Sequence, residues 1–160
     1  MKNLLLVHVR IELIAGSNLK YAINADGEMA LQRRLSADLA HPFNYGCIPG
    51  TKSGDGEELD AFVISSRPLK VAELLSARVI GVLYVRDEMG EDDKIISVDA
   101  SDKSLSNLSR ISEMPTAQSK YLSELIKHNR DGIPGANNAV LGYGGASQAA
   151  EILERSIVHE

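Results

Sequence analysis

The chain begins with short β-type runs and reaches helical patterning only near its end, and this order restricts the architectures open to it. From Leu4 to Leu13 the side chains alternate, as expected of a half-buried strand. The apolar face holds Val7, Val9, Ile11 and Leu13, and the polar face holds His8, Arg10 and Glu12. Further short runs bounded by Gly, Pro, Asp and Asn lie at Leu19–Ile23, Met29–Leu31, Asp60–Ile64, Arg78–Val85 and Lys94–Val98. These strands predict a small barrel.

Two helical patterns follow the strands. The first has Pro115 near its start and Gly132 at its end, with apolar side chains one turn apart at Tyr121, Leu122, Leu125 and Ile126. A turn at Gly144 and Gly145 precedes the second, in which Ser147 is a candidate cap and the apolar stripe is Ala149, Ile152, Leu153 and Ile157. The pattern predicts an α+β fold, a closed or partly open barrel with helices outside, in one domain over residues 1–160.

Charge and cysteine content narrow the class of protein. The 160 residues carry 17 Lys plus Arg and 22 Asp plus Glu, which gives a net charge of −5. Binding of duplex nucleic acid or of an anionic membrane needs a net basic surface, which this charge does not supply. The single cysteine, Cys47, allows no intrachain disulfide and no CxxC knuckle, which favours a reducing compartment, the cytoplasm. The apolar opening is interrupted at His8 and Arg10, and we expect neither secretion nor membrane insertion.

Two acidic segments stand out. Residues 55–60 (DGEELD) hold four carboxylates in six residues, and residues 87–93 (DEMGEDD) hold five in seven. Asp60 stands where an apolar strand starts, and Asp87 stands where another ends, so strands anchor both segments. Carboxylates packed together need a cation, and oxygen ligands suit Mg²⁺, Mn²⁺ or Ca²⁺. The sequence therefore predicts a divalent-metal site.

The alternative is that these carboxylates are solvated turn residues, as charge runs commonly are. An EF-hand is excluded, because its sixth position requires Gly where this chain has Asp60 or Asp92, and its twelfth requires Glu where the chain has Ser66 or Val98. Zinc has little support, since His8 and His128 are isolated. We interpret residues 142–145 as a plain turn.

Candidate ligands for phosphate oxygens accompany the acidic segments: Lys20, Arg33, Arg34, Tyr45 and Lys94. Taken singly, the two lysines are as well explained as solvated surface residues, and Tyr45 as a core residue with a satisfied hydroxyl.

Three stretches carry a resemblance to a known family: FNYG at 43–46, SGDGEELDAFV at 53–63 and GVLYVRDEMGEDDKIISV at 81–98. The chain resembles the family I soluble inorganic pyrophosphatases, whose signature is approximately D-G-D-P-x-D, a hydrophobic strand, and a later strand ending in DExGEDxK. The resemblance implies an OB-like five-stranded β-barrel with flanking C-terminal helices. It also implies Mg²⁺-dependent hydrolysis of inorganic diphosphate, with Mn²⁺ as a second metal, and a homo-oligomer, in bacterial relatives commonly a hexamer.

The resemblance also implies roles for individual residues. The metal ligands are Asp55, Asp60, Asp87 and Asp92, with Glu12 acting through water. The groups on phosphate oxygens are Lys20, Arg33, Lys94 and Arg130, while Tyr45 lies near the nucleophile or substrate. Glu57 takes the place of the middle aspartate of D-G-D-P, the carboxylate that accepts or orients the proton.

The chain departs from the family pattern at several of these positions. Glu58 stands in place of the signature proline, Ala22 in place of a glutamate after the substrate lysine, and His41 in place of a tyrosine; the Tyr-Lys pair of the long helix corresponds to Asn129 and Arg130. One alternative is therefore a diverged paralogue with weak activity or with another phosphoanhydride substrate. The other is an OB-like nucleic-acid-binding module, against which stands the small number of aromatic side chains: two Phe, five Tyr and no Trp.

Overall fold

A computed structural model describes residues 5–35, 43–54, 56–114, 119–120, 122–124, 126 and 138–158. The strands are β1 Leu6–Leu13, β2 Leu19–Ile23, β3 Met29–Arg34, β4 Asn44–Ile48, β5 Leu59–Ile64, β6 Leu74–Asp87, β7 Gly90–Glu91, β8 Lys94–Asp99 and β9 Ala139–Gly145. Two 3₁₀ turns, η2 Lys103–Leu105 and η3 Ile111–Glu113, precede the helix α2 Ala146–Ser156. The described residues at 119–120, 122–124 and 126 are helical, in agreement with the first helical pattern.

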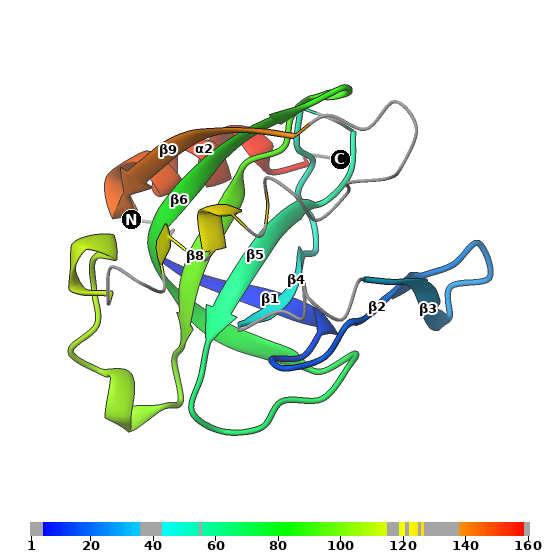
Figure 1. Ribbon diagram of the computed structural model, residues 1–160, viewed down its shortest axis with the longest axis horizontal. Coiled ribbons are helices and arrows are strands. Elements are labelled where there is room, and N and C mark those ends of the chain that lie inside the picture. The colour runs from blue at the N-terminus through cyan, green and yellow to red at the C-terminus, as the bar shows by residue number, and fades with distance from the viewer. Residues whose placement is uncertain are drawn as a thin grey trace.

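One strongly curved mixed sheet forms the centre of the molecule (Figure 1). Its strands follow the order β1-β4-β5-β8-β6, and the start of β6 pairs with β1, which joins the two ends of this order. β5 and β8 are parallel, while the other neighbours are antiparallel. The short β7 and the late β9 both pair with β6. The expected α+β fold, an OB-like sheet with C-terminal helix, is confirmed.

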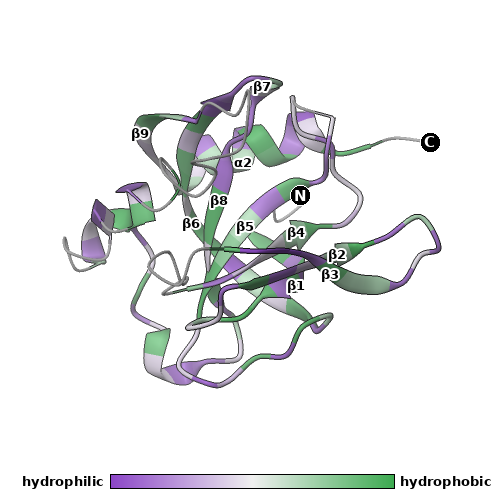
Figure 2. Cartoon of the chain, turned by 45° about the vertical axis from the view of Figure 1, so that its right-hand side comes forward, coloured by the Kyte–Doolittle hydropathy of each residue, from purple (hydrophilic) through white to green (hydrophobic). Residues whose placement is uncertain are grey.

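Both faces of this sheet are apolar. One face packs against the buried side of α2, and its cluster includes Val9, Ile11, Ala61, Val63, Ile95, Ile152 and Leu153. The other face includes Leu13, Phe62, Ile96, Leu122 and Ile126, the last two from the helical residues described above. Figure 2 shows hydrophobic and hydrophilic residues side by side on α2, as expected of a helix with one face on the sheet and one face in water. The sheet is thereby fixed from both sides, which gives rigid positions to side chains at its ends.

The turn predicted at Gly144 and Gly145 is wrong, because both residues belong to β9, which runs beside β6. A Cβ on Gly144 would lie 2.7 Å from the Tyr84 hydroxyl, so glycine here permits close strand pairing rather than a turn. The expected cap Ser147 is also wrong. The N-cap is Gly145, whose N–H donates to Gln148 Oε1 at 2.9 Å.

The strands β2 and β3 form a separate two-stranded hairpin (Figure 1). Lys20 pairs with Arg33 across it, with a register shift next to Lys20. Among the described residues, no helix is long and apolar enough to cross a membrane.

Candidate active site

One row of residues across four strands forms the floor of the candidate site. In register, Arg10 of β1 lies opposite Cys47 of β4, Cys47 opposite Asp60 of β5, and Asp60 beside Lys94 of β8. Because side chains in register share a face of a sheet, these groups project to the same side. The topology therefore gathers residues that lie far apart in the sequence.

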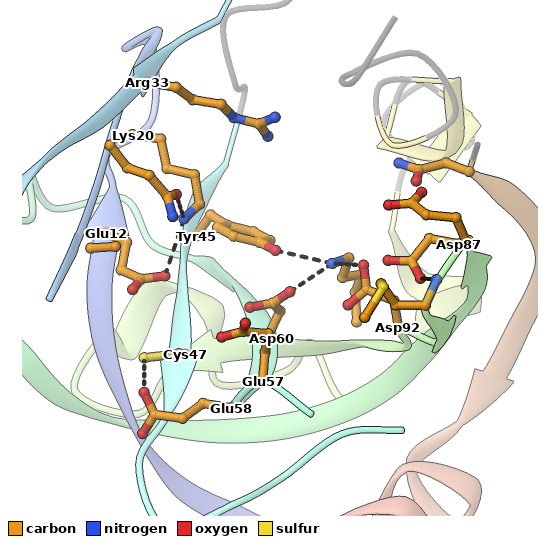
Figure 3. A pocket seen from close by; sticks show the side chains of 16 residues that line it. Glu12, Lys20, Arg33, Tyr45, Cys47, Glu57, Glu58, Asp60, Asp87 and Asp92 are labelled. Atoms are coloured by element: carbon orange, nitrogen blue, oxygen red, sulfur yellow. Dashed lines mark hydrogen bonds and ion pairs between the residues drawn. The ribbon is translucent and has the colours of Figure 1, made fainter. Parts of the chain in front are cut away.

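This row opens into a cavity of about 520 Å³. The cavity is lined by Glu12, Lys20, Ala22, Gln32, Arg33, Tyr45, Cys47, Glu57, Glu58, Asp60, Asp87, Glu88, Met89, Asp92, Lys94 and Asn138. Figure 3 shows Lys20 and Arg33 on one side and Asp87 and Asp92 on the other, with Asp60 between them. Nine sequence-predicted site residues are thus brought together: Glu12, Lys20, Arg33, Tyr45, Glu57, Asp60, Asp87, Asp92 and Lys94.

Four positions singled out in the sequence, Asp55, Arg130, His41 and Asn129, lie outside the described residues. Among the lining residues, sequence analysis missed Gln32, Cys47, Met89 and Asn138 as site residues. Gln32 and Cys47 had a usable signal, since each lies one or two residues from a candidate ligand along a strand. Nothing in the sequence pointed to Asn138.

Lys94 is the centre of the polar network. Its Nζ lies 2.6 Å from Asp60 Oδ2 and 2.9 Å from Asp92 Oδ2, and it donates to the Tyr45 hydroxyl at 3.1 Å. The residue is only 5% exposed. Burial alone lowers the pKa of this ammonium, but the opposite charges of Asp60 and Asp92 outweigh burial and raise the pKa well above its ordinary value. Lys94 is therefore a permanent cation.

Tyr45 supports Lys94 from β4. Its ring packs edge-on against Phe62 at a centroid distance of 5.0 Å, and Lys94 Nζ lies 5.6 Å from the ring centre. Burial and the nearby carboxylate of Asp60 raise the pKa of the phenol well above its ordinary value. The Tyr45 hydroxyl therefore keeps its proton and can act as a hydrogen-bond donor.

Lys20 occupies the opposite wall, on the β2–β3 hairpin. Its Nζ donates to Gln32 Oε1 at 2.7 Å and lies 3.8 Å from Glu12 Oε1. Glu12 lies two residues after Arg10 on the polar face of β1, and it is buried. Burial raises the pKa of Glu12, although Lys20 acts against this shift. A cation in the cavity would therefore stabilise the charged carboxylate of Glu12.

The two acidic turns lie in direct contact. Ser53 Oγ donates to the carbonyl of Glu91 at 2.9 Å, and a Cβ on Gly54 would approach Glu91 Cβ to 2.8 Å. At the end of β6, Asp87 Oδ1 accepts from the N–H of Met89 at 2.7 Å. Asp93 lies buried behind the second turn, where it accepts from the N–H of Val85 at 2.9 Å. Hence Asp93 is an anchor of this turn, while Asp87 and Asp92 line the cavity.

The donor set suits a hard divalent cation. Among the described residues, seven carboxylates line the cavity and three basic side chains face them. Within that part of the chain, which leaves out Asp55, no three His, Cys, Asp or Glu side chains form a preassembled metal cluster. The ammonium of Lys94 already lies between Asp60 and Asp92, so the two carboxylates are paired by an internal cation. Oxygen-only ligands with excess negative charge fit Mg²⁺ or Mn²⁺ better than softer metals.

A family model described as inorganic pyrophosphatase matches residues 9–159. The inorganic pyrophosphatase of Sulfolobus acidocaldarius is 36% identical over 154 residues, which are 94% of this chain and 89% of the relative. That of Saccharolobus solfataricus is 33% identical over 154 residues, covering 94% and 90%. The matched part of the chain includes both acidic turns.

Solved structures agree with these relatives. The crystal structure of an inorganic pyrophosphatase from Neisseria gonorrhoeae has a TM-score of 0.88 and 35% identity, and covers 96% of this chain and 90% of that one. The inorganic pyrophosphatase from Thermus thermophilus gives a TM-score of 0.91 at 31% identity, with coverage of 98% and 92%. The similarity therefore covers nearly all of the chain, and not only the acidic motifs.

Proposed function

The chain belongs to the inorganic pyrophosphatase family and hydrolyses inorganic diphosphate to two phosphates, and we propose that this reaction takes place in the cavity above β4 and β5. The observation that supports this location is the opposition of charges across one cavity. Asp87 and Asp92 of the second acidic turn stand on one side, Lys20 and Arg33 stand on the other, and Glu57 and Asp60 of the first turn lie between them (Figure 3). An anionic substrate needs cations on every side, whereas the carboxylates need a metal to stand between them and the substrate.

We propose Mg²⁺ as the resident metal, with Mn²⁺ able to replace it. The residues that would hold it are Asp60, Asp87 and Asp92, with Glu12 through water and with Asp55, which lies outside the described residues. A bound metal would neutralise part of the negative charge of diphosphate and would lower the pKa of a water molecule.

The side chains of this chain have separable roles in the proposal. Lys20 and Arg33 bind phosphate oxygens from the hairpin, and Arg130 is proposed to join them from outside the described part. Lys94 and Tyr45 bind phosphate oxygens from the floor, where the Tyr45 hydroxyl retains its proton. Glu57 accepts the proton of the attacking water. Placement of the water and the phosphorus in line is the main contribution of such a site to the rate.

A phosphate-release assay on the purified chain tests this proposal. We expect release from diphosphate with Mg²⁺, less with Mn²⁺, and far less from ATP or tripolyphosphate. Asp60→Asn and Asp92→Asn should each reduce kcat by at least about 10²-fold, because each removes a charge that the metal requires. The matched control is Asp26→Asn, in the exposed turn of the β2–β3 hairpin, which should change kcat less than about twofold.

Failure of the wild-type chain to release phosphate with any divalent metal would reject the proposal. Preferred cleavage of ATP or tripolyphosphate would instead favour the diverged paralogue, an alternative that the comparisons do not favour. Calorimetry with Mg²⁺ separates metal binding from turnover, and the heat of binding should be lost in Asp60→Asn and kept in Asp26→Asn.

The role of Glu57 has its own test. Glu57→Gln keeps the shape of the side chain but cannot accept a proton, so we expect kcat to fall by roughly 10²- to 10⁴-fold. Binding of Mg²⁺ in the calorimeter should change little. An unchanged kcat would transfer the proton-accepting role to another carboxylate of the cavity.

We also propose that the chain assembles into a homo-oligomer, as a hexamer, and that it works in the cytoplasm. The support for the compartment is that the chain has a single cysteine, Cys47, which is free and buried, so its fold does not use a disulfide. Sedimentation equilibrium tests the oligomer, with a single species near six times 17.3 kDa as the expected result. A monomer would contradict this part of the proposal alone.

A further inference from the structure

Glu58 stands where the family signature has proline, directly after the proposed proton acceptor. A proline restricts its own φ and also confines the residue before it to extended backbone. In a signature with proline at this position, the ring therefore limits the backbone of the catalytic carboxylate. Glu58 has no such ring, so the turn of this chain needs another restraint if Glu57 is to keep one position.

That restraint is present in the side chain of Glu58. Its Oε1 accepts from Arg10 Nη2 at 2.7 Å, and the same nitrogen donates to Cys47 Sγ at 3.0 Å. The thiol in turn lies 3.4 Å from Glu58 Oε1. Burial raises the pKa of Cys47, so the sulfur stays a neutral thiol that can donate to Glu58. Arg10 and Cys47 face each other across β1 and β4, so the anchor of Glu58 is the rigid sheet.

The ion pair is partly shielded from water, mainly on the arginine side. The side chain of Arg10 is 19% exposed and that of Glu58 is 38% exposed. Partial removal of water strengthens the attraction between opposite charges, and a guanidinium holds a carboxylate in a defined orientation. Both Glu57 and Glu58 line the cavity, and the carboxylate of Glu58 is directed toward Arg10.

The backbone around Glu57 is fixed only in part without this pair. Two backbone hydrogen bonds close the turn on its first side: the N–H of Gly56 donates to the carbonyl of Ser53 at 3.0 Å, and the N–H of Ser53 donates to the carbonyl of Glu57 itself at 2.7 Å. After Glu58, the N–H of Leu59 donates to Thr51 Oγ1 at 2.9 Å and starts β5. The side chain of Glu58 supplies a tether between these two points, next to the residue whose position decides the proton transfer.

We propose that Arg10 and Glu58 are positioning residues, and that their ion pair restricts the turn that carries Glu57 as a proline ring would. The inference rests on the proposed function and deepens it, because it assigns to Glu58 a task distinct from metal binding or proton transfer. A displacement of about 1 Å in a catalytic group can reduce a rate on the order of 10²-fold, so a tether at this position affects turnover.

The experiment compares Glu58→Ala with Glu58→Pro. Alanine removes the tether, so kcat for diphosphate should fall about 10- to 100-fold, while KM changes less than about twofold because Lys20 and Arg33 are untouched. Proline restores restriction of the backbone, and the N–H of Glu58 donates no hydrogen bond among the described residues that proline would remove. Glu58→Pro should therefore keep kcat within about threefold of wild type. If Glu58→Ala keeps the wild-type rate, or if proline is as slow as alanine, the proposal is overturned.

The arginine is tested by a double-mutant cycle. Arg10→Met keeps the apolar stem and should lower kcat to the level of Glu58→Ala, and the double variant should be no more than about twofold slower than either. Effects that multiply in the double variant would contradict a shared tether. The matched control is Glu73→Ala, which removes a carboxylate paired with Arg67 at 2.9 Å away from the cavity and should leave kcat within about twofold.

Hydrogen exchange gives a readout that is independent of catalysis. The Gly56 amide should exchange at least about fivefold faster in Glu58→Ala and Arg10→Met than in wild type or Glu73→Ala. Unchanged exchange would overturn the tether. If instead the wild-type chain proved inactive while exchange responded as expected, the proposed function would fail and the tether would stand.

Discussion

Lys94 is the residue on which the charge balance of the cavity depends. It is the first residue of β8, it is buried, and it lies within hydrogen-bond distance of Asp60 and Asp92. Two carboxylates brought together at the end of a buried strand repel each other unless a cation stands between them. In the structure the ammonium is that cation, so Lys94 preserves the arrangement of the acidic side chains.

We predict that Lys94→Met destabilises the metal-free chain strongly. Removing one partner of a buried ion pair leaves uncompensated charge, and the free energy of unfolding in EDTA should fall by roughly 3–5 kcal/mol. Added Mg²⁺ should then stabilise the variant more than it stabilises wild type, because a cation that binds only the folded state supplies the missing charge. Urea unfolding with EDTA and with Mg²⁺ measures both effects.

The control for this prediction is Lys103→Met, in the exposed turn η2, which should stay within about 0.5 kcal/mol of wild type under both conditions. Equal stability of Lys94→Met and wild type in EDTA would show that Asp60 and Asp92 do not need the ammonium. Equal gains from Mg²⁺ in the two proteins would lead to the same conclusion.

At the level of elements, the site depends on how closely the two acidic turns pack. The turn before β5 and the β6–β7 hairpin meet at Gly54 and Glu91, where Ser53 links them by a hydrogen bond. β7 is held further by the ion pair between Glu91 and Arg155 of α2, at 2.9 Å. Contact between the two turns sets the separation of the carboxylates that they carry.

Gly54→Ala should therefore push the turns apart. The new Cβ would lie 2.8 Å from Glu91 Cβ, closer than real Cβ contacts, so one backbone must move. We expect kcat to fall at least about tenfold and the affinity for Mg²⁺ to fall with it, as measured by phosphate release and calorimetry.

Removal of the opposing Cβ provides the matched test. In the Glu91→Gly background, Gly54→Ala should lower kcat much less than it does in wild type. The reference for the double variant is therefore Glu91→Gly alone. Absence of recovery would mean that the loss has a cause other than this contact.

The strands show what the sequence can and cannot predict. Alternation located β1, and short β-type runs between turn residues located β2, β3, β5, β6 and β8, with β2 at its observed bounds. β4 was missed because its sequence NYGCI contains Asn and Gly, which are depleted in strands, and follows Pro42 without a clear apolar run. β9 was missed because its glycines are poor strand formers, and only the packing against Tyr84 makes them favourable.

The site shows the same limit. Strand ends next to acidic runs indicated anchored positions for Asp60 and Asp87 but left open that the carboxylates are solvated, and the family resemblance predicted Asp60, Asp87 and Asp92 in one site, where they line one cavity. The partners of Glu58 could not be predicted, because Arg10 and Cys47 meet it only through the register of three strands. Long-range register depends on the whole sheet and leaves no local trace in the sequence.

At the scale of the molecule, β8 joins the cavity to the opposite end of the sheet. It begins with Lys94 and ends with Asp99, which is 1% exposed. Asp99 accepts from Arg67 Nε at 2.7 Å, Ser65 Oγ at 2.8 Å and Ser101 Oγ at 2.8 Å. One carboxylate thus fastens the segment after β5 to the end of β8.

Asp99 gives the stability of the whole molecule a dependence on pH. Burial acts to raise the pKa of Asp99, but the hydrogen bonds from Ser101, Ser65 and Arg67 outweigh burial, and the pKa lies below its ordinary value. A carboxylate whose pKa is lower in the folded state contributes stability above its unfolded pKa, about 3.9 for aspartate, and loses it as the pH falls through the folded pKa. Glu12 and Asp93, whose pKa values burial raises, act with the opposite sign, so the wild-type curve alone does not isolate Asp99.

The difference between wild type and Asp99→Asn isolates it. At pH 7 the variant should unfold at lower urea, because asparagine cannot pair with the charge of Arg67, and the gap should stay constant down to about pH 5. Below about pH 4 the gap should narrow as the wild-type carboxylate takes up a proton. Urea titrations of both proteins from pH 3 to pH 7 measure this. The difference in stability between the two proteins could instead stay constant through pH 3 or widen there. Either result would show that the negative charge of Asp99 is not what stabilises this end of the sheet.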